Sequence, residues 1–223
     1  MNMPVKSPSK RQPSPRVKQK YAQARQEVLE TALALLQSGG VEAVTLAAVA
    51  GEMGMTKQAL YHYFSSKEDL VRSLVTTLLD AEIEALIGAI EKVESGAESL
   101  GSLIRAFYEH YIGRLDAFRS IYCQSQLYSS PGPTLDPDTV KDEINPRTRH
   151  LFDVLEERIA GSSASKDRRE RMRRLAFSAW LSALGLMTML GVADALNDPL
   201  VHPDADLLDT LAGVFDEAAR NQA

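Results

Sequence analysis

The chain has 223 residues, is 44% hydrophobic and carries 25 basic and 30 acidic side chains, which give a net charge of -5. This length and apolar content suffice for a globular protein with a substantial core. Its single cysteine, Cys123, excludes an intrachain disulfide, and the polar N-terminus lacks the apolar segment of a secretory signal, so we expect a cytoplasmic location.

The charge is unevenly distributed along the chain. Residues 1–66 hold eight basic and four acidic side chains, whereas the remainder has a net excess of acids. A basic N-terminal part on an acidic body suggests a module that binds a polyanion, joined to a unit with another role. The alternative is that these charges only form solvated faces.

The first element in chain order is a basic arm over residues 1–17. The segment that contains it, MNMPVKSPSKRQPSPRVKQK, has four prolines and no acid, so it cannot bury enough apolar surface to order itself. We therefore expect this arm to be disordered. A mitochondrial presequence is the competing interpretation, but the prolines break the amphipathic helix that it needs.

Helical periodicity dominates after the arm. Apolar residues between Tyr21 and Leu36 recur at three- and four-residue steps, and the glycine pair Gly39-Gly40 suits a helix C-terminus. Thr45 can then cap a short second helix. These signals predict two helices within the first part of the chain.

Two further cap signals follow. Thr56 can cap a third helix that runs to about Phe64. The Ser-x-x-Glu spacing from Ser65 to Glu68 then predicts the start of a long fourth helix. Beyond it the pattern stays helical, with breaks at Pro-, Gly- and Ser-rich segments and no convincing strand.

The third predicted helix separates its side chains onto two faces. Leu60 and Phe64 are apolar and four residues apart, so they must face the core. The outward face carries a cation, an amide, a phenol and an imidazole, all able to donate hydrogen bonds to phosphates or base edges. These four side chains are Lys57, Gln58, Tyr61 and His62. We expect Tyr63 to pack against the first or the fourth helix instead.

This arrangement resembles the DNA-binding segment of the TetR family of bacterial transcriptional regulators. The resemblance runs from about Arg25 to Leu70 and is carried by RQEVLETALALLQSGGVEAV and TLAAVAGEMGMTKQALYHYFSSKEDL. Two residues depart from the family's pattern: Met53 stands where alanine is usual, and Leu36 where an aromatic is common. Neither departure touches the outward face. The matching positions include Gly40, Thr45, Val49, Ala50, Gly54, Tyr61, Phe64 and Lys67.

The resemblance implies an all-α fold with two domains. An N-terminal three-helix helix-turn-helix DNA-binding domain would cover residues 18–66, and a larger helical effector-binding and dimerisation domain residues 67–223. Lys57 and Gln58 would reach base edges in the major groove, and the other residues would hold the phosphate backbone. The residues that we assign to DNA binding are Thr45, Thr56, Lys57, Gln58, Tyr61, His62 and Lys67.

The basic arm has two possible roles in such a protein. It could add phosphate or minor-groove contacts, or it could be a solubilising tail.

Residues 175–193, LAFSAWLSALGLMTMLGVA, carry no charge. Alone this stretch could cross a membrane, but a helix that is apolar all round can also lie between its own core and a partner subunit. The resemblance favours burial, because the family dimerises through its last two long helices. We expect a homodimer that reads a palindromic double-stranded operator, with no membrane contact. The predicted interface residues are Ala176, Ala179, Ser182, Ala183 and Gly185.

The resemblance also implies a small-molecule effector, which the sequence does not identify. No cluster of arginines marks a strongly anionic ligand, and no excess of acids marks a cationic one. The predicted lining consists of aromatic and polar residues on the helices of the body. They are Phe107, Tyr108, Tyr111, Tyr122, Gln126, Tyr128, Phe152, Trp180 and Met187.

The sequence shows no set of side chains that would indicate an enzyme active site. The four histidines show no metal-ligand spacing, Cys123 has no basic neighbour in the sequence, and there is no glycine-rich phosphate loop. We therefore expect no metal, no cofactor and no catalysis, and predict a repressor released from its operator by a small-molecule effector. The alternatives are an activator or effector-insensitive regulator and, from a different class, a helical membrane-associated or scaffold protein.

Overall fold

The computed structural model describes residues 14–123, 137–196 and 202–221, and every regular element in these ranges is helical. Residues 1–13 of the predicted arm lie outside the described residues. Three short elements are not α-helical: η1 is a 3-10 helix, and η2 and η3 are π-helical. The elements are α1 (Pro15–Ala43), α2 (Leu46–Glu52), α3 (Lys57–Leu60), α4 (Lys67–Lys92), η1 (Gly96–Glu98), α5 (Ser99–Tyr111), α6 (Leu115–Phe118), η2 (Arg119–Cys123), α8 (Pro137–Thr139), η3 (Val140–Ile144), α9 (Asn145–Ala160), α10 (Lys166–Leu196) and α11 (Asp204–Asn221).

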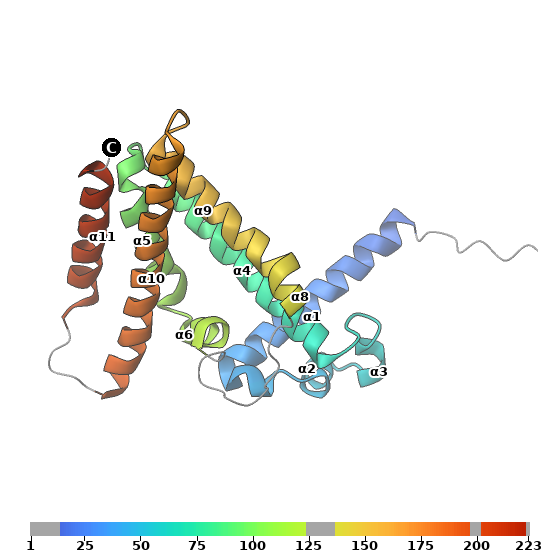
Figure 1. The fold of residues 1–223 in the computed structure, drawn as a ribbon. Helices are drawn as coiled ribbons and strands as arrows, with labels where there is room; N and C mark the ends of the chain where they lie inside the picture. Colours follow the sequence, from blue (N-terminus) through green and yellow to red (C-terminus); the bar gives the residue numbers. More distant parts are fainter. Residues whose placement is uncertain (1–13, 124–136, 197–201, 222–223) are drawn as a thin grey trace, which may run out of the picture.

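The long helix α4 joins two groups of helices (Figure 1). The short helices α2 and α3 lie with α1 at one end of α4. At its other end α5, α10 and α11 pack together, and α9 runs alongside α4. The all-α prediction is confirmed.

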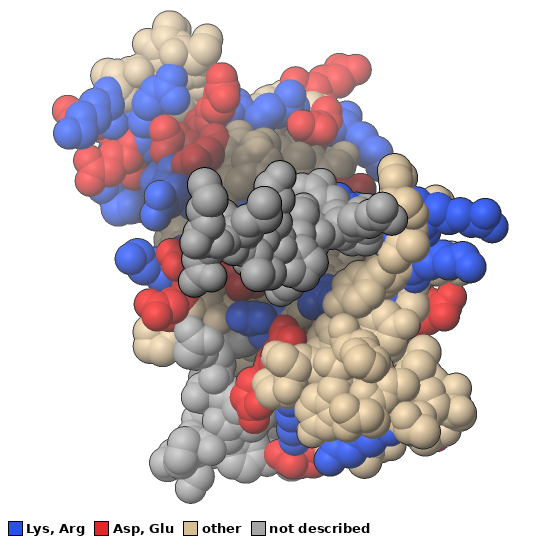
Figure 2. All heavy atoms as spheres, turned by 90° about the vertical axis from the view of Figure 1, so that its right-hand side faces the viewer, with Lys and Arg blue, Asp and Glu red and all other residues tan. Residues whose placement is uncertain are grey.

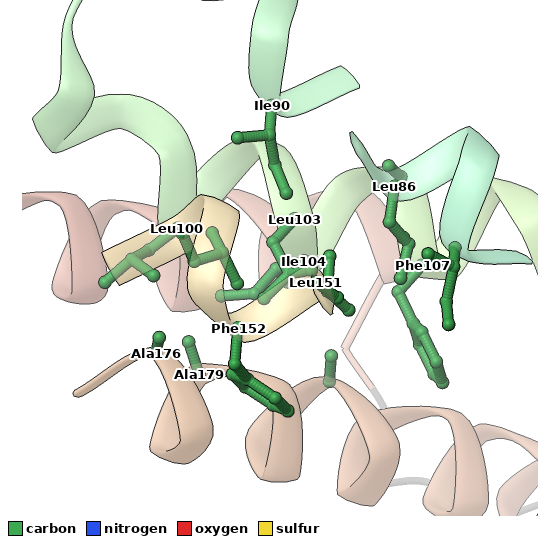
Figure 3. Packing of buried hydrophobic residues seen from close by; sticks show 14 of the residues in the cluster. Leu86, Ile90, Leu100, Leu103, Ile104, Phe107, Leu151, Phe152, Ala176 and Ala179 are labelled. Atoms are coloured by element: carbon green, nitrogen blue, oxygen red, sulfur yellow. The ribbon is translucent and has the colours of Figure 1, made fainter. Parts of the chain in front are cut away.

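Each group of helices has its own hydrophobic core, and α4 contributes to both. The first core joins α1, α2 and α3 to the N-terminal half of α4 as far as Leu78. The second starts at Leu79 and includes buried side chains of α5, α9, α10 and α11. Figure 3 shows part of this second core, where Leu103 and Phe107 of α5 meet neighbouring helices. The predicted domain boundary at residue 66 precedes α4, whereas the change of core falls inside this helix.

The start of α4 differs by one residue from the prediction. Ser66, not Ser65, is the N-cap: its hydroxyl accepts a hydrogen bond of 3.1 Å from the Asp69 N–H. The Asp69 carboxylate accepts in return from the Ser65 N–H at 2.9 Å. A reciprocal cap of this kind satisfies two N–H groups that the helix leaves unpaired, so the motif is present but shifted along the chain.

The start of α1 and the end of α3 also differ from prediction. α1 begins at Pro15, inside the predicted arm; its break at Gly40, where φ is 69°, lies at the predicted glycine pair, and a further short helical segment runs to Ala43. α3 ends at Leu60, and the next residues continue as turns, so the prediction of a helix to about Phe64 was too long.

The uncharged stretch 175–193 lies within α10 and packs one of its faces against the second core. Figure 3 shows Ala176 and Ala179 pointing from α10 toward this core. Among the residues that the structure describes, no helix combines the length and the apolarity needed to span a membrane.

The packing of α11 against α5 depends on a glycine at the start of α5. The Gly101 N–H donates a 2.7 Å hydrogen bond to the carboxylate of Asp216, which is only 9% exposed. A Cβ at position 101 would overlap this carboxylate. The close approach of the two helices therefore requires glycine here.

We predict that Gly101→Ala lowers the free energy of unfolding by about 1 to 3 kcal/mol, the usual cost of overpacking a buried site. Gly88→Ala is the matched control, because a Cβ there meets nothing within 4 Å and Gly88 lies inside α4. The control should be neutral or stabilising by up to about 1 kcal/mol. Urea unfolding of both variants measures the difference, and equal stabilities would contradict the prediction.

Candidate DNA-binding surface and effector cavity

α2 and α3 form a helix-turn-helix with a capped start on each helix. The Thr45 hydroxyl accepts from the Ala48 N–H at 3.1 Å, and the Thr56 hydroxyl accepts from the Ala59 N–H at 3.1 Å. Gly54 in the intervening turn has a φ of 62°, a left-handed conformation that favours glycine. Both predicted caps are confirmed, and each threonine keeps its own O–H free to donate to a further acceptor.

The two faces of α3 lie as predicted. Leu60 and Phe64 are fully buried in the first core, whereas Lys57 and Gln58 are exposed. The Tyr61 side chain is 42% exposed, and the Lys57 ammonium lies 5.9 Å from its ring centroid. The outward side chains are therefore available to a partner without any change in the core.

The segment after α3 is held against α1 by two tyrosines. The Tyr21 hydroxyl donates to the backbone carbonyl of His62 at 3.1 Å, and its ring lies 5.2 Å from that of Tyr63. The prediction that Tyr63 packs against the first or the fourth helix is confirmed, with the first helix, α1, as its partner. The His62 side chain remains exposed, so its carbonyl is anchored while its imidazole faces outward.

Arg25 connects three elements beneath this surface. Its guanidinium carbon lies 4.4 Å from the centroid of the Phe64 ring, and it donates to the Ser73 hydroxyl of α4 at 2.7 Å. A guanidinium over an aromatic face contributes about 0.5 to 2 kcal/mol, more when it is shielded from water. Arg25 thus fixes the end of the helix-turn-helix on both α1 and α4.

Further basic side chains lie near this surface. The predicted residue Lys67, at the start of α4, lies 3.9 Å from the Glu42 carboxylate, a long ion pair with an exposed acid. Arg16, Lys18 and Lys20 are exposed on the first turns of α1, and of these only Arg16 falls in the arm that the sequence predicted to be disordered. In Figure 2, which views the side where α1 begins, basic side chains project at the right-hand edge of this face, and another group lies among acidic side chains at its upper left. These charges favour contact with a polyanion.

A cavity of about 1010 Å³ lies among α4, η2, η3, α9 and α10. Val75 and Leu79 of α4 form one wall, and Trp180 of α10 belongs to another. Ile121 and Tyr122 of η2 contribute a third. The remaining lining residues are Ile144, Asn145, Thr148, Arg149, Phe152, Glu170, Arg173, Arg174, Phe177 and Ser178.

Three of these lining residues are arginines, and their ion pairing differs. Arg173 binds the carboxylates of Asp153 and Glu156 at 2.7 and 3.0 Å, which raises its pKa. Arg174 pairs with Glu170 at 3.2 Å on the exposed surface. Arg149 has no acidic partner in the part of the chain that the structure describes.

The structure therefore corrects the expectation that no arginine cluster marks an anionic ligand. Arg149 comes from α9, whereas Arg173 and Arg174 come from α10, and folding brings them to one cavity. Sequence reasoning missed them because it examined each helix separately.

The predicted pocket residues divide into three groups. Tyr122, Phe152 and Trp180 line the cavity. Gln126 and Tyr128 lie outside the described residues. The others do not line it: Phe107, Tyr111 and Met187 are buried in the second core, and the Tyr108 hydroxyl donates to Asp204 of α11 at 2.8 Å.

The predicted interface residues of α10 fall into two groups, buried and accessible. Ala176, Ala179 and Ala183 are at most 2% exposed and pack in the core of their own chain, so they are not free to meet a partner. Gly185 is exposed and Ser182 half-buried. Among the described residues of α10 and α11, four large apolar side chains are exposed: Phe177, which also lines the cavity, Leu181, Met189 and Val214.

Comparison with known proteins places this architecture in a family. Residues 28–74 match the family model described as "Bacterial regulatory proteins, tetR family". This match covers α2, α3 and the flanking parts of α1 and α4. The chain belongs to the TetR family. It is a TetR-type transcriptional regulator, as the sequence predicted.

Relatives and solved structures agree with this assignment. The HTH-type transcriptional repressor KstR2 of Mycolicibacterium smegmatis is 25% identical over 150 residues, which cover 66% of this chain and 70% of that protein. A TetR/AcrR regulator from Thermobifida fusca has the same fold, with a TM-score of 0.59 and 20% identity over 87% of this chain and 97% of that one.

A second solved structure with this TetR fold has a ligand bound. It is the regulator FadR from Bacillus subtilis in complex with stearoyl-CoA, with a TM-score of 0.61 and 14% identity over 85% of this chain and 96% of that one. At this identity the likeness concerns the fold.

We expect two substitutions on α3 to weaken DNA binding in different ways. Tyr61→Ala should weaken binding to every duplex, because a phosphate contact carries no sequence information. Lys57→Ala should relax the preference at one base pair, at a cost of about 1 to 3 kcal/mol.

Fluorescence anisotropy with a selected operator and a scrambled duplex separates the two effects. Glu84→Ala, at an exposed position of α4 remote from α3, is the control and should bind like wild type. Wild-type affinity of both α3 variants for both duplexes would disprove the assignment of this face.

Proposed function

We propose that this TetR-type regulator represses its target as a homodimer and leaves its operator when an amphipathic, anionic small molecule fills the cavity. Repression is supported by the relatives, because KstR2 proteins from two mycobacterial genera are named transcriptional repressors. Activation, or regulation without an effector, is the alternative within the family. The position of the operator relative to the promoter separates these possibilities.

One observation carries the proposal: α4 joins the recognition surface to the cavity. Leu70 and Leu74 of α4 pack in the first core beneath α3, while Val75 and Leu79 line the cavity. A ligand that changes the position of Val75 or Leu79 therefore changes the support of the recognition helix. Binding of the ligand and of DNA is coupled if each favours a different position of α4.

A second contact supports the same coupling. Ile121 of η2 lines the cavity and packs against both hydrophobic cores. Its neighbour in the chain, helix α6, contacts α1 of the DNA-binding domain. An effector in the cavity thus meets two elements, α4 and η2, that both touch the helices around α3.

The ligand class follows from the lining. Aliphatic and aromatic side chains provide most of the wall and suit an apolar body. Arg149 and Arg174 suit an anionic group, since guanidinium groups bind carboxylates and phosphates in a bidentate fashion. Stearoyl-CoA, the ligand of the structurally similar FadR, combines these two features.

The DNA-binding roles follow from the α3 surface. We assign Lys57 and Gln58 to base edges, and Tyr61, His62 and Lys67 to phosphates. The exposure of these side chains and the rigid anchoring of α3 support this assignment. Thr45 and Thr56, which sit at helix N-termini, would add hydroxyl donors to phosphates.

Dimerisation through α10 and α11 would place two recognition helices on one duplex. The two helices pack beside each other (Figure 1), and each has an exposed apolar side chain on its surface: Leu181 is 47% and Val214 58% exposed. Apolar surface of this kind on neighbouring helices is typical of an interface. A two-fold axis there would match a palindromic operator.

We predict that Leu181→Glu converts the dimer to a monomer, because the partner would have to bury an unpaired carboxylate. Ile112→Glu is the matched control, since Ile112 is 40% exposed at the end of α5 and belongs to neither α10 nor α11. Analytical ultracentrifugation should find only the first variant monomeric. A wild-type monomer at micromolar concentration, or a dimeric Leu181→Glu variant, would argue against this interface.

We also predict that stearoyl-CoA releases the protein from its operator and that Arg149→Ala raises the concentration needed by about tenfold, the value of one charge-assisted hydrogen bond. Arg171→Ala is the control, because Arg171 is exposed on α10 but does not line the cavity. Operator release is followed by anisotropy. Retention on DNA at saturating stearoyl-CoA would exclude this ligand class.

A further inference from the structure

A buried carboxylate stands directly behind the wall of the cavity. Glu82 of α4 is 1% exposed and lies about one helical turn beyond Leu79, which lines the cavity. In the described part of the chain no basic side chain pairs with it. Burying an acid without a counter-ion is costly unless other groups satisfy its oxygens.

Two phenols satisfy this acid. The Tyr122 hydroxyl donates to both oxygens of Glu82, at 2.8 Å to Oε1 and 2.9 Å to Oε2, and the Tyr111 hydroxyl donates to Oε2. Burial raises the pKa of Glu82, and the two phenol donors oppose this effect. The cluster thus joins α4, α5 and η2 through one acid.

Tyr111 and Tyr122 have different surroundings. Tyr111 is 1% exposed, and its ring packs against Phe107 and Phe118 with centroid distances of 5.1 and 5.5 Å. Tyr122 lines the cavity, with its ring 6.1 Å from that of Trp180. Tyr122 is therefore the member of the cluster that a ligand would meet, while Tyr111 positions Glu82.

The existing hydrogen bond of Tyr122 determines which ligand groups this part of the wall can bind. A phenol has one hydrogen to donate, and that of Tyr122 is directed to Glu82. For a further partner, Tyr122 keeps only the acceptor capacity of its oxygen.

Among the polar side chains that line the cavity, two positions thus differ in character. Arg149 and Arg174 provide positive charge, whereas Tyr122 backed by Glu82 provides an acceptor. A molecule with an anionic group at both positions satisfies only one of them. A molecule with an anionic group at the arginines and a hydroxyl at Tyr122 satisfies both.

We propose that Glu82 and Tyr122 form a second recognition point that selects effectors carrying a hydroxyl, or another hydrogen-bond donor, in addition to their anionic group. This inference rests on the proposed effector role of the cavity and adds a chemical requirement at a second position in it. Glu82 acts through Tyr122 and is a positioning residue.

The single tryptophan of the chain, Trp180, lines the cavity, so its fluorescence reports ligand binding directly. The probes are hexadecanoate, ω-hydroxyhexadecanoate and hexadecanedioate, with the corresponding dodecyl series to allow for reach, all titrated into the full-length protein. Wild type should bind the ω-hydroxy acid about tenfold more tightly than the diacid of the same length.

Three variants locate the cause of this discrimination. Glu82→Gln should reduce it to about twofold or less, because the amide N–H can donate to Tyr122 and free the phenol proton for the cavity. Tyr122→Phe should lose the preference for the hydroxyl and tests the same point if Glu82→Gln does not fold. Glu84→Gln, an exposed acid on the same helix, is the control and should keep the wild-type ratio.

The outcomes separate this inference from the proposed function. Binding of all acids with equal affinity by wild type, or an unchanged ratio in Glu82→Gln and Tyr122→Phe, would show that the cluster only links helices and would overturn the inference alone. Absence of any Trp180 response to every probe, together with retention on the operator, would overturn the amphipathic effector and this inference with it.

Discussion

The sharing of α4 between two hydrophobic cores is the constraint on which the rest of the structure depends. Leu78 packs with the DNA-binding helices, and the next residue, Leu79, packs with the body. One continuous helix cannot rotate at one end and stay fixed at the other without breaking its hydrogen bonds. The recognition surface is therefore held by the same helix that forms a wall of the cavity, and neither site can be described separately.

The segment from α6 to η2 complements α4. It contacts α1 on one side, while Ile121 packs against both cores and Tyr122 bonds to Glu82. A π-helical turn is a less regular element than an α-helix and often occurs at functional sites. Two of the elements around the cavity, the rigid α4 and the irregular η2, are thus tied to each other through the buried acid Glu82.

Sequence reasoning succeeded where the signal is local. The burial of Leu60 and Phe64 follows from four-residue spacing, and the caps at Thr45 and Thr56 follow from side-chain chemistry. It failed where distant segments meet. The arginines of the cavity and the Glu82 cluster combine side chains from different helices, and the uncharged stretch 175–193 of α10 does not reveal which of its faces is the inner one.

The outward position of Lys57 and Gln58 has an evolutionary consequence. Both side chains lie outside the two cores, and neither lines the cavity. Under the base-edge roles proposed for these residues, a substitution at either position would change the DNA sequence that is bound without a penalty in folding or in ligand recognition. Descendants of a duplicated gene could therefore acquire new target promoters while they keep the ancestral inducer, or acquire a new inducer under an unchanged promoter.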